Sequence, residues 1–146
     1  MDRFVSSFTC RFDAKGRISL PAPYRAILAR QSFEGLFVTP SLDHPALDCG
    51  GAALLAEIEA LLASLPLWSA QRDAYASALL GAGEWLRLDA EGRMSLSEKF
   101  KSRLSLLQDA IFVGQGHKFQ IWAPERFGAH LSAAQAQLRQ LRSGAQ

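Results

Sequence analysis

Hydrophobic positions follow two different periods along this chain, and each period predicts one kind of element. Short segments that are apolar, or that alternate apolar with polar residues, predict β-strands. These segments are residues 4–12, 17–20, 36–40, 46–49, 84–88, 93–96, 110–114 and 119–123. Longer segments with apolar residues three or four positions apart predict helices at 21–31, 50–65, 69–83, 97–108 and 123–142. The end of the chain beyond Arg142 is expected to fray.

The pattern occurs twice. Residues 13–25 align with residues 89–101 with six identities in thirteen positions, and Arg11 aligns with Arg87. The identical pairs are Asp13/Asp89, Ala14/Ala90, Gly16/Gly92, Arg17/Arg93, Ser19/Ser95 and Leu20/Leu96. Such self-similarity indicates a duplication. We therefore expect an α+β fold of strand-strand-helix-strand-strand-helix repeated twice, with a first repeat at 4–68, a helical connection at 69–83 and a second repeat at 84–140.

Each repeat is too small to be stable by itself. A unit of about seventy residues with strand edges to cover has a marginal core. The halves are therefore expected to share one core, packed about a pseudo-twofold axis. The apolar strand at 36–40 and the leucine-rich helices are expected to offer surfaces for assembly.

Each copy contains a tight turn, "DAKG" at Asp13 and "DAEG" at Asp89. Gly16 and Gly92 suit the positive φ that a hairpin turn requires, and an Asp side chain accepts hydrogen bonds from the N–H groups of its own turn. The next strand alternates, so that Arg17 is expected on the face opposite to the apolar one.

Charge is unevenly distributed, although the formal net charge is only +2. Residues 1–25 hold five bases and two acids, residues 43–73 hold five acids and one base, and the chain from Arg126 onward holds three arginines and no acid. The two cysteines, Cys10 and Cys49, form no CxxC pair, which favours a reduced, cytosolic compartment. No apolar run approaches the roughly 18 residues of a membrane span, so no membrane partner is predicted.

The sequence contains no convincing catalytic constellation, and no enzyme, cofactor site or metal site is predicted. His44 and His117 fall at similar places in the two copies and are interpreted as two copies of one loop residue. Asp43, His44, Asp48 and Cys49 form a loose cluster without a recognised metal-ligand spacing.

The pattern Asp-x-x-x-Arg occurs at Asp13/Arg17 and again at Asp89/Arg93. In one interpretation each pair only pins its turn. In the other, Asp fixes the turn so that the charged, fork-shaped Arg projects toward phosphate or a guanine edge. The second interpretation predicts one basic DNA-facing surface made of Arg11, Lys15, Arg17, Ser19 and Arg25.

At these residues the sequence resembles the MraZ family, bacterial transcriptional regulators encoded at the head of the division and cell-wall gene cluster. The paired segments "DAKGRISLPAPYR" and "DAEGRMSLSEKFK" carry the resemblance, and each half is similar to an AbrB-like swapped-hairpin β-barrel domain. The resemblance implies a ring-shaped homo-oligomer that binds direct repeats in double-stranded promoter DNA, usually as a repressor, in the cytoplasm and at the nucleoid. Asp13, Arg17, Asp89 and Arg93 match the family motif, with Lys15 beside the first pair.

The second copy departs from this pattern, because Glu91 replaces Lys15. A carboxylate beside the reading arginine repels phosphate unless it pairs with Lys99, Lys101 or a neighbouring subunit, so the second turn is expected to contribute less to DNA binding. The alternative hypothesis is a protein-interaction or scaffold module, in which the Asp-x-x-x-Arg hairpins are structural and the acidic middle of the chain binds a partner.

Overall fold

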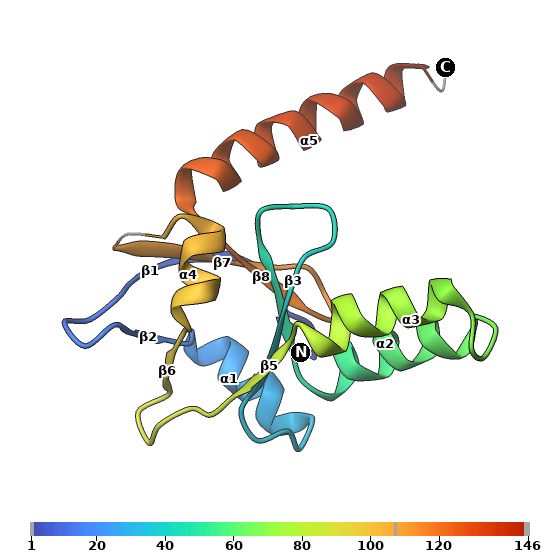
Figure 1. Ribbon diagram of the computed structural model, residues 1–146. Coiled ribbons are helices and arrows are strands. Elements are labelled where there is room, and N and C mark those ends of the chain that lie inside the picture. Colours follow the sequence, from blue (N-terminus) through green and yellow to red (C-terminus); the bar gives the residue numbers. More distant parts are fainter. Residues whose placement is uncertain (1, 107, 145–146) are drawn as a thin grey trace.

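The computed structural model describes residues 2–106 and 108–144 as a mixed α+β arrangement of antiparallel sheets and helices (Figure 1). The first half consists of β1 (Ser7–Arg11), β2 (Arg17–Ser19), α1 (Ala22–Arg30), β3 (Leu36–Pro40), β4 (Leu47–Gly50) and α2 (Ala52–Ala63). The second half consists of β5 (Glu84–Leu86), β6 (Arg93–Ser95), α4 (Glu98–Leu104), β7 (Asp109–Gly114), β8 (Phe119–Trp122) and α5 (Pro124–Gly144). Between the halves lie α3 (Ala70–Ala76) and a π-helical turn, η1 (Ser77–Gly81). The predicted order of elements is confirmed.

The two halves exchange strands. The six-stranded sheet has the order β1-β7-β8-β4-β3-β5, so β1 of the first half pairs with β7 of the second, while β5 of the second half pairs with β3 of the first. A separate ladder joins β2 to β6 and sets Ile18 opposite Met94. Interchanging the halves leaves this pairing unchanged, which is the relation that a pseudo-twofold axis produces.

The predicted turns form, but they do not close local hairpin ladders. The backbone N–H of Asp13 donates to the carbonyl of Arg17 at 2.8 Å, and Asp89 donates to Arg93 at 2.9 Å. Beyond these bonds, β1 and β2 diverge to pair with β7 and β6. The turns thus join strands that do not pair locally, because β1, β2, β5 and β6 each pair with a strand of the other half.

One hydrophobic core contains residues of both halves, as predicted. It includes three equivalent pairs, every member at most 4% exposed: Ile18/Met94, Leu20/Leu96 and Tyr24/Phe100. Strand β3 lies inside the large sheet between β4 and β5, with Leu36 and Val38 fully buried. The expectation that this strand offers an assembly surface is therefore wrong, because its apolar side chains fill the chain's own core.

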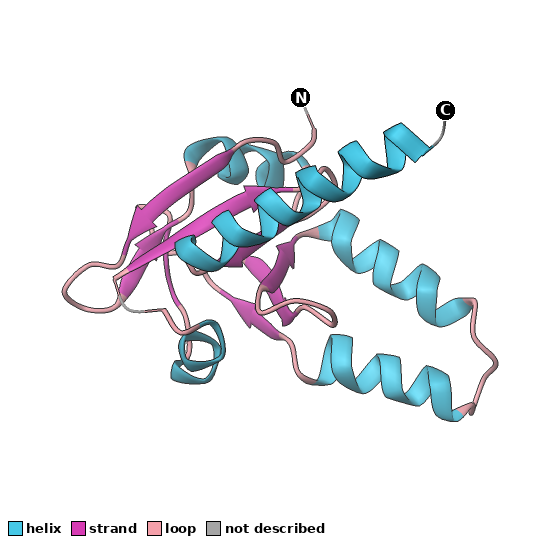
Figure 2. Cartoon of the chain, turned by 90° about the horizontal axis from the view of Figure 1, so that it is seen from above, coloured by secondary structure: helices cyan, strands magenta, loops and turns pink. Residues whose placement is uncertain are grey.

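Helices α2 and α3 project from the sheet as an arm (Figure 2). The buried face of α2, which consists of Leu54, Ile58 and Leu62, packs with Phe37 and Leu79. The predicted helix at 69–83 is α-helical only to Ala76 and then widens into η1. In this turn the carbonyl of Leu79 accepts a bond from the Thr39 hydroxyl at 2.8 Å. A side chain that bonds to a helix carbonyl in this way favours local widening of the helix.

Helix α5 leaves the body of the molecule (Figure 1). Its first turns are anchored by Trp122, whose ring lies 4.6 Å from that of His130 and 5.8 Å from that of Phe127. No residue of α5 is buried. The helix continues to Gly144, beyond the predicted end at Arg142, and residues 145–146 lie outside the described part of the chain. Within the described residues, no helix is both long and apolar enough to cross a membrane.

Candidate nucleic-acid interface

The first turn is fixed by the carboxylate of Asp13. Its Oδ1 accepts the backbone N–H groups of Lys15 and Arg17, both at 2.9 Å, and its Oδ2 accepts the Arg17 Nε–H at 2.9 Å. Gly16 takes the required positive φ of 78°. The Asp13 side chain thus fixes both the backbone of the turn and the Nε–H of Arg17.

The second turn repeats this geometry. Oδ1 of Asp89 accepts the backbone N–H groups of Glu91 and Arg93 at 2.9 Å, and Oδ2 accepts the Arg93 Nε–H at 2.8 Å. Gly92 has a φ of 79°. Both turns therefore present their arginine in the same way, as the duplication predicts.

These bonds keep the two aspartates ionised. The backbone N–H of Arg17 is the largest cause of the lowered pKa of Asp13, with smaller contributions from the Arg17 side chain and the Lys15 N–H. The Arg93 N–H lowers the pKa of Asp89 in the same way. Hydrogen bonds to a carboxylate stabilise its charged form. Each arginine thus stays paired with an anion across the neutral pH range.

The two turns differ at one side chain. Oε2 of Glu91 lies 2.8 Å from Nη2 of Arg93, so two carboxylates hold that guanidinium, and its pKa is raised, chiefly by the Asp89 hydrogen bond. In the first turn Lys15 occupies the equivalent position, and within the described residues no group bonds to the Nη atoms of Arg17. Glu91 therefore pairs with the arginine of its own turn rather than with Lys99 or Lys101.

The β2–β6 ladder presents a polar face to solvent. Because side chains alternate along a strand, burial of Ile18 and Met94 directs their neighbours outward. The outward residues are Arg17, Ser19, Arg93 and Ser95. Arg17 lies opposite Ser95, and Ser19 lies opposite Arg93, so the two arginines are diagonal neighbours on one face. The pattern predicted for Arg17 and Ser19 is confirmed, and the ladder adds the second copy beside them.

Arg87 joins this face, although it was not among the residues predicted to bind DNA. With Arg17, Arg93 and Ser95 it lines a shallow hollow of about 370 Å³ beside the ladder. Arg87 is exposed. The signal for it was present in the duplication, which aligns Arg87 with Arg11. Arg11 itself is exposed, and its Nε forms an ion pair with Oδ1 of Asp109 at 3.3 Å.

Arg25 is not part of the first turn's surface. Its Nη1 donates to the carbonyl of Glu91 at 3.0 Å, and its guanidinium fills the space where a Cβ on Gly92 would lie. The equivalent cation, Lys101, sits over the Phe12 ring at 5.0 Å and beside the first turn. Each turn is therefore supported by a cation from the other half. Arg25, on α1, therefore lies beside the second turn, whereas Arg11, Lys15 and Arg17 lie on or next to the first turn.

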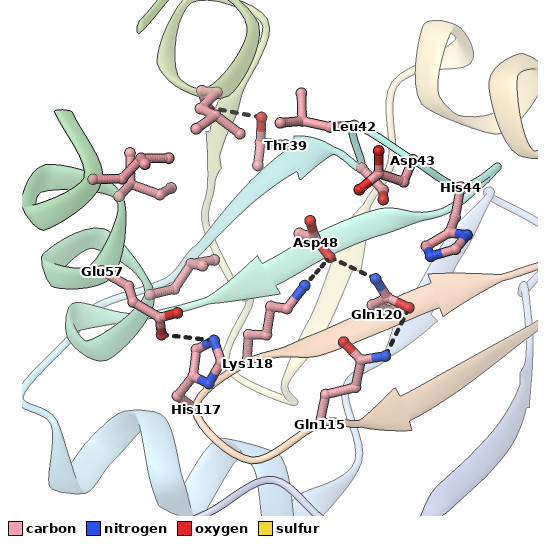
Figure 3. Close-up of a pocket in the computed structure, with 15 residues that line it drawn as sticks. Thr39, Leu42, Asp43, His44, Asp48, Glu57, Gln115, His117, Lys118 and Gln120 are labelled. Atoms are coloured by element: carbon pink, nitrogen blue, oxygen red, sulfur yellow. Dashed lines mark hydrogen bonds and ion pairs between the residues drawn. The ribbon is translucent and has the colours of Figure 1, made fainter. Parts of the chain in front are cut away.

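A second hollow, of about 480 Å³, lies between the arm and the large sheet (Figure 3). Its floor is a polar network in which Oδ1 of Asp48 accepts bonds from Lys118 and Gln120, both at 2.7 Å. His117 bonds to Glu57 at 2.7 Å. The Asp48 bonds join β4 to β8 and to the loop before β8, and the His117–Glu57 contact ties that same loop to α2.

The residues considered for enzyme chemistry lie in or near this hollow without forming an active centre. His44 packs against Trp122 and His130, and His117 is bonded to Glu57. Cys49 is buried, and burial raises the pKa of its thiol well above the ordinary value, which disfavours a nucleophilic thiolate. Within the described residues no three His, Cys, Asp or Glu side chains are grouped to hold a metal ion.

Comparisons with known proteins show the family of this chain. A family model described as "MraZ protein, putative antitoxin-like" matches residues 79–144. The chain is 53% identical to the transcriptional regulator MraZ of Methylocella silvestris and 54% identical to that of Beijerinckia indica, each over 97% of this chain and 87% of the relative. The transcriptional regulator MraZ of Rickettsia akari is 32% identical over 92% of this chain and 91% of the relative. The resemblance carried by the two turns is therefore confirmed, and the chain belongs to the MraZ family of transcriptional regulators.

Proposed function

We propose that this protein is a sequence-specific DNA-binding repressor of its own division and cell-wall gene cluster, and that the first turn is its main DNA-facing element. One observation carries this proposal. Asp13 holds Arg17 through Nε, while the outer Nη atoms have no partner among the described residues. A guanidinium that is held through Nε and leaves both Nη atoms accessible is suited to bidentate contact with guanine.

The family is one of transcriptional regulators and not of enzymes. Its members regulate transcription, and DNA is the ligand that the exposed ladder suits. The major groove, about 12 Å wide, accepts a two-stranded β-ribbon. The three-residue strands β2 and β6 span roughly 10 Å at about 3.4 Å per residue, so their outward face fits across the groove.

The contacts divide into two kinds in this proposal. Arg17 reads a base edge, and Ser19 on the same strand lies close enough to contact the backbone. Lys15, which is exposed at the tip of the turn, binds phosphate, as do the exposed Arg11 and Arg87. Phosphate contacts position the protein, whereas base contacts specify the sequence.

A single subunit has too few such contacts for tight binding. Each neutralised phosphate contributes about −0.9 to the slope of log affinity against log salt, and affinity accumulates with their number. We therefore include a ring-shaped homo-oligomer that presents several first turns along promoter direct repeats. In head-to-tail assembly all subunits point in the same direction around the ring, which matches DNA repeats that all run in one direction.

The same proposal covers the fold of the two halves, their connection and the place where the protein acts. Each half, 4–68 and 84–140, is an AbrB-like swapped-hairpin β-barrel repeat, joined by the helical connection at 69–83. The reciprocal pairing of β1 with β7 and of β5 with β3 supports this interpretation. The protein acts in the cytoplasm, at the nucleoid.

The test is binding of the purified protein to its own upstream DNA and to a scrambled duplex of equal composition, across a salt series. We expect preference for the promoter. In a Lys15→Ala/Arg17→Ala variant the salt slope should be flatter by about one for each phosphate that the protein no longer neutralises. Arg3→Ala, which removes an exposed cation outside both turns, is the charge control. Equal affinity for both duplexes at every salt concentration would refute the proposal.

The alternative function, a protein-interaction module, has its own supporting observation. At the tip of the arm Trp68 is 92% exposed and Leu67 is 64% exposed. Exposed apolar side chains in one place mark contact surfaces. A Leu67→Ser/Trp68→Ser variant that keeps promoter binding but no longer regulates the promoter in cells would favour this function.

A further inference from the structure

We infer that the hollow between the arm and the large sheet receives helix α5 of a second copy of this chain. The inference rests on the proposed homo-oligomer and names the contact that would build it. It combines a groove and a helix that lie on different parts of the same molecule and that match in both apolarity and charge.

The groove has an apolar wall. Leu54, Ile58, Leu61 and Leu79 line it on the side of the arm, and Leu42 lines it on the β3–β4 loop. Leu61 remains 38% exposed and Leu42 remains 50% exposed. Figure 3 shows this loop facing the arm across the hollow. Leu61 and Leu42 are therefore the apolar side chains that the chain leaves uncovered, whereas Leu54, Ile58 and Leu79 belong to the chain's own core.

The groove is also acidic. Asp43, Asp48 and Glu57 line it together with Lys118, His44 and His117. Lys118 is bonded to Asp48, and His117 is bonded to Glu57. Residues 43–73, which include the loop and most of the arm, hold five acids and one base. An apolar partner that carries positive charge is therefore favoured over a neutral or acidic one.

Helix α5 has the complementary character. Phe127, Leu131, Ala134, Leu138 and Leu141 follow one another at alternating steps of four and three residues, and so share one face of the helix. Leu131, Leu138 and Leu141 are 42%, 58% and 61% exposed. Arg139 and Arg142 flank this stripe, and Glu125 is the only acid on the helix. Phe127 packs on Trp122, and from Leu131 to Leu141 the stripe is an exposed, basic, amphipathic surface.

The chain's own helix does not fill its own groove. Trp122 and His130 stack and fix the first turns of α5 on the body, and the helix then runs clear of the arm (Figure 1). The stretch from Leu131 to Gly144 extends about 20 Å at about 1.5 Å per residue, enough to reach another subunit. A projecting helix and a groove elsewhere on the same chain make a head-to-tail contact, which closes into a ring when the rotation permits.

Disulfide trapping tests this geometry. In a Cys10→Ser background, one preparation carries Leu42→Cys in the groove and another carries Leu138→Cys on the helix. We expect a covalent dimer after oxidation of the mixture, and none in either preparation alone. A dimer from Leu138→Cys alone would mean that α5 pairs with α5 and would overturn the inference. Absence of a dimer in the mixture would overturn it as well.

Charge reversal tests it independently. Arg139→Glu/Arg142→Glu should lower the assembled fraction at least tenfold at a fixed protein concentration, measured by native mass spectrometry. Adding Asp43→Lys/Glu57→Lys to the same chain should restore assembly. The control Glu59→Lys changes an exposed acid of α2 that does not line the groove and should leave assembly unchanged.

These measurements separate the inference from the proposed function. If the wild-type chain is monomeric at micromolar concentration, the proposed ring fails and the inference fails with it. If rings form and persist in Arg139→Glu/Arg142→Glu, only the inference fails. Promoter binding by the assembled wild-type protein, compared with that by Arg17→Ala, tests the first turn without a change to α5.

Discussion

Oε2 of Glu91 lies 2.8 Å from Nη2 of Arg93, at the position where the first turn has Lys15. This contact distinguishes Arg93 from Arg17, because the Nε bonds of the two arginines are otherwise the same. Arg93 is enclosed by two carboxylates, whereas only Asp13 holds Arg17 among the described residues. The duplication therefore preserved the turn, while one substitution changed the charge that the turn presents to solvent.

Arg17→Ala should weaken promoter binding more than Arg93→Ala. A bidentate contact to guanine contributes about 1–3 kcal/mol of discrimination, so we expect roughly a 5- to 150-fold loss for Arg17→Ala and a much smaller loss for Arg93→Ala. Arg17→Lys is the matched control, because it keeps the charge and loses the fork. Fluorescence anisotropy on promoter and scrambled DNA measures both changes. Equal losses for the two alanine variants would refute the asymmetry.

Glu91→Lys should strengthen DNA binding. The change removes the carboxylate that holds Nη2 of Arg93 and adds a cation at the tip of the second turn. We expect tighter binding and a salt slope that is steeper by about one, since one more phosphate can be neutralised. Glu91→Gln removes only the negative charge and should give a smaller gain. The reverse substitution, Lys15→Glu, should weaken binding and flatten the slope.

Gly92→Ala should destabilise the fold more than Gly16→Ala. Both positions have positive φ, which costs an alanine about 1–2 kcal/mol. At Gly16 the nearest atom is the flexible Nζ of Lys101, but at Gly92 the new Cβ collides with the Arg25 guanidinium. Urea unfolding measures the difference. In an Arg25→Ala background the two glycine substitutions should cost similar free energies, and a persistent gap would contradict this account.

The duplication allowed most of the local structure to be predicted. The order of elements, the positive φ of Gly16 and the bonds from Asp13 to its own turn all follow from short-range chemistry. Ser97 caps α4, with its Oγ accepting from the Phe100 N–H at 3.3 Å, and serine is a preferred residue at this position. Alternation placed Arg17 on the outer face of its strand.

The pattern of hydrophobic residues did not predict which strands pair with one another. Two similar halves offer each strand a partner within its own half and an equivalent partner in the other, and periodicity does not distinguish them. The exchange decides where Arg25 and Lys101 lie, and it joins Arg17 to Arg93 on one ladder. The acidic groove was likewise hidden, because it is formed by residues of the arm, the β3–β4 loop and β8 that are far apart in the chain.

Replacing Asp13 with Asn should destabilise the protein in a pH-dependent way. The pKa of Asp13 is lowered in the folded state, so its stabilising contribution is present above the ordinary value of 3.8 and is lost as the pH falls through the lower folded value. We expect the difference in unfolding free energy between wild type and Asp13→Asn to be full near neutral pH. It should shrink as the pH falls below the ordinary value. Urea titrations across this range measure it, and a difference independent of pH would contradict the role of the charge.

Because of Tyr24, we expect the stability of the fold to decrease, rather than increase, with rising pH in the alkaline range. Its hydroxyl donates to the carbonyl of Ser6 at 2.7 Å, and burial raises the pKa of Tyr24 to about 12. A group whose pKa is raised on folding stabilises the fold below its ordinary pKa of 10, and that contribution is lost as the pH rises through the folded value. Stability should therefore fall between these two pH values.

Tyr24→Phe should remove this alkaline loss while costing about 1 kcal/mol near neutral pH, because one hydrogen bond disappears. The fold accommodates the change, since the equivalent position in the second half is Phe100, which is fully buried. Tyr75→Phe changes the other tyrosine and should leave the alkaline slope as it is in the wild type. Urea unfolding at increasing pH, followed together with phenolate absorbance, compares the three proteins. If the Tyr24→Phe variant loses stability over the same pH range as the wild type, another group is responsible for the slope.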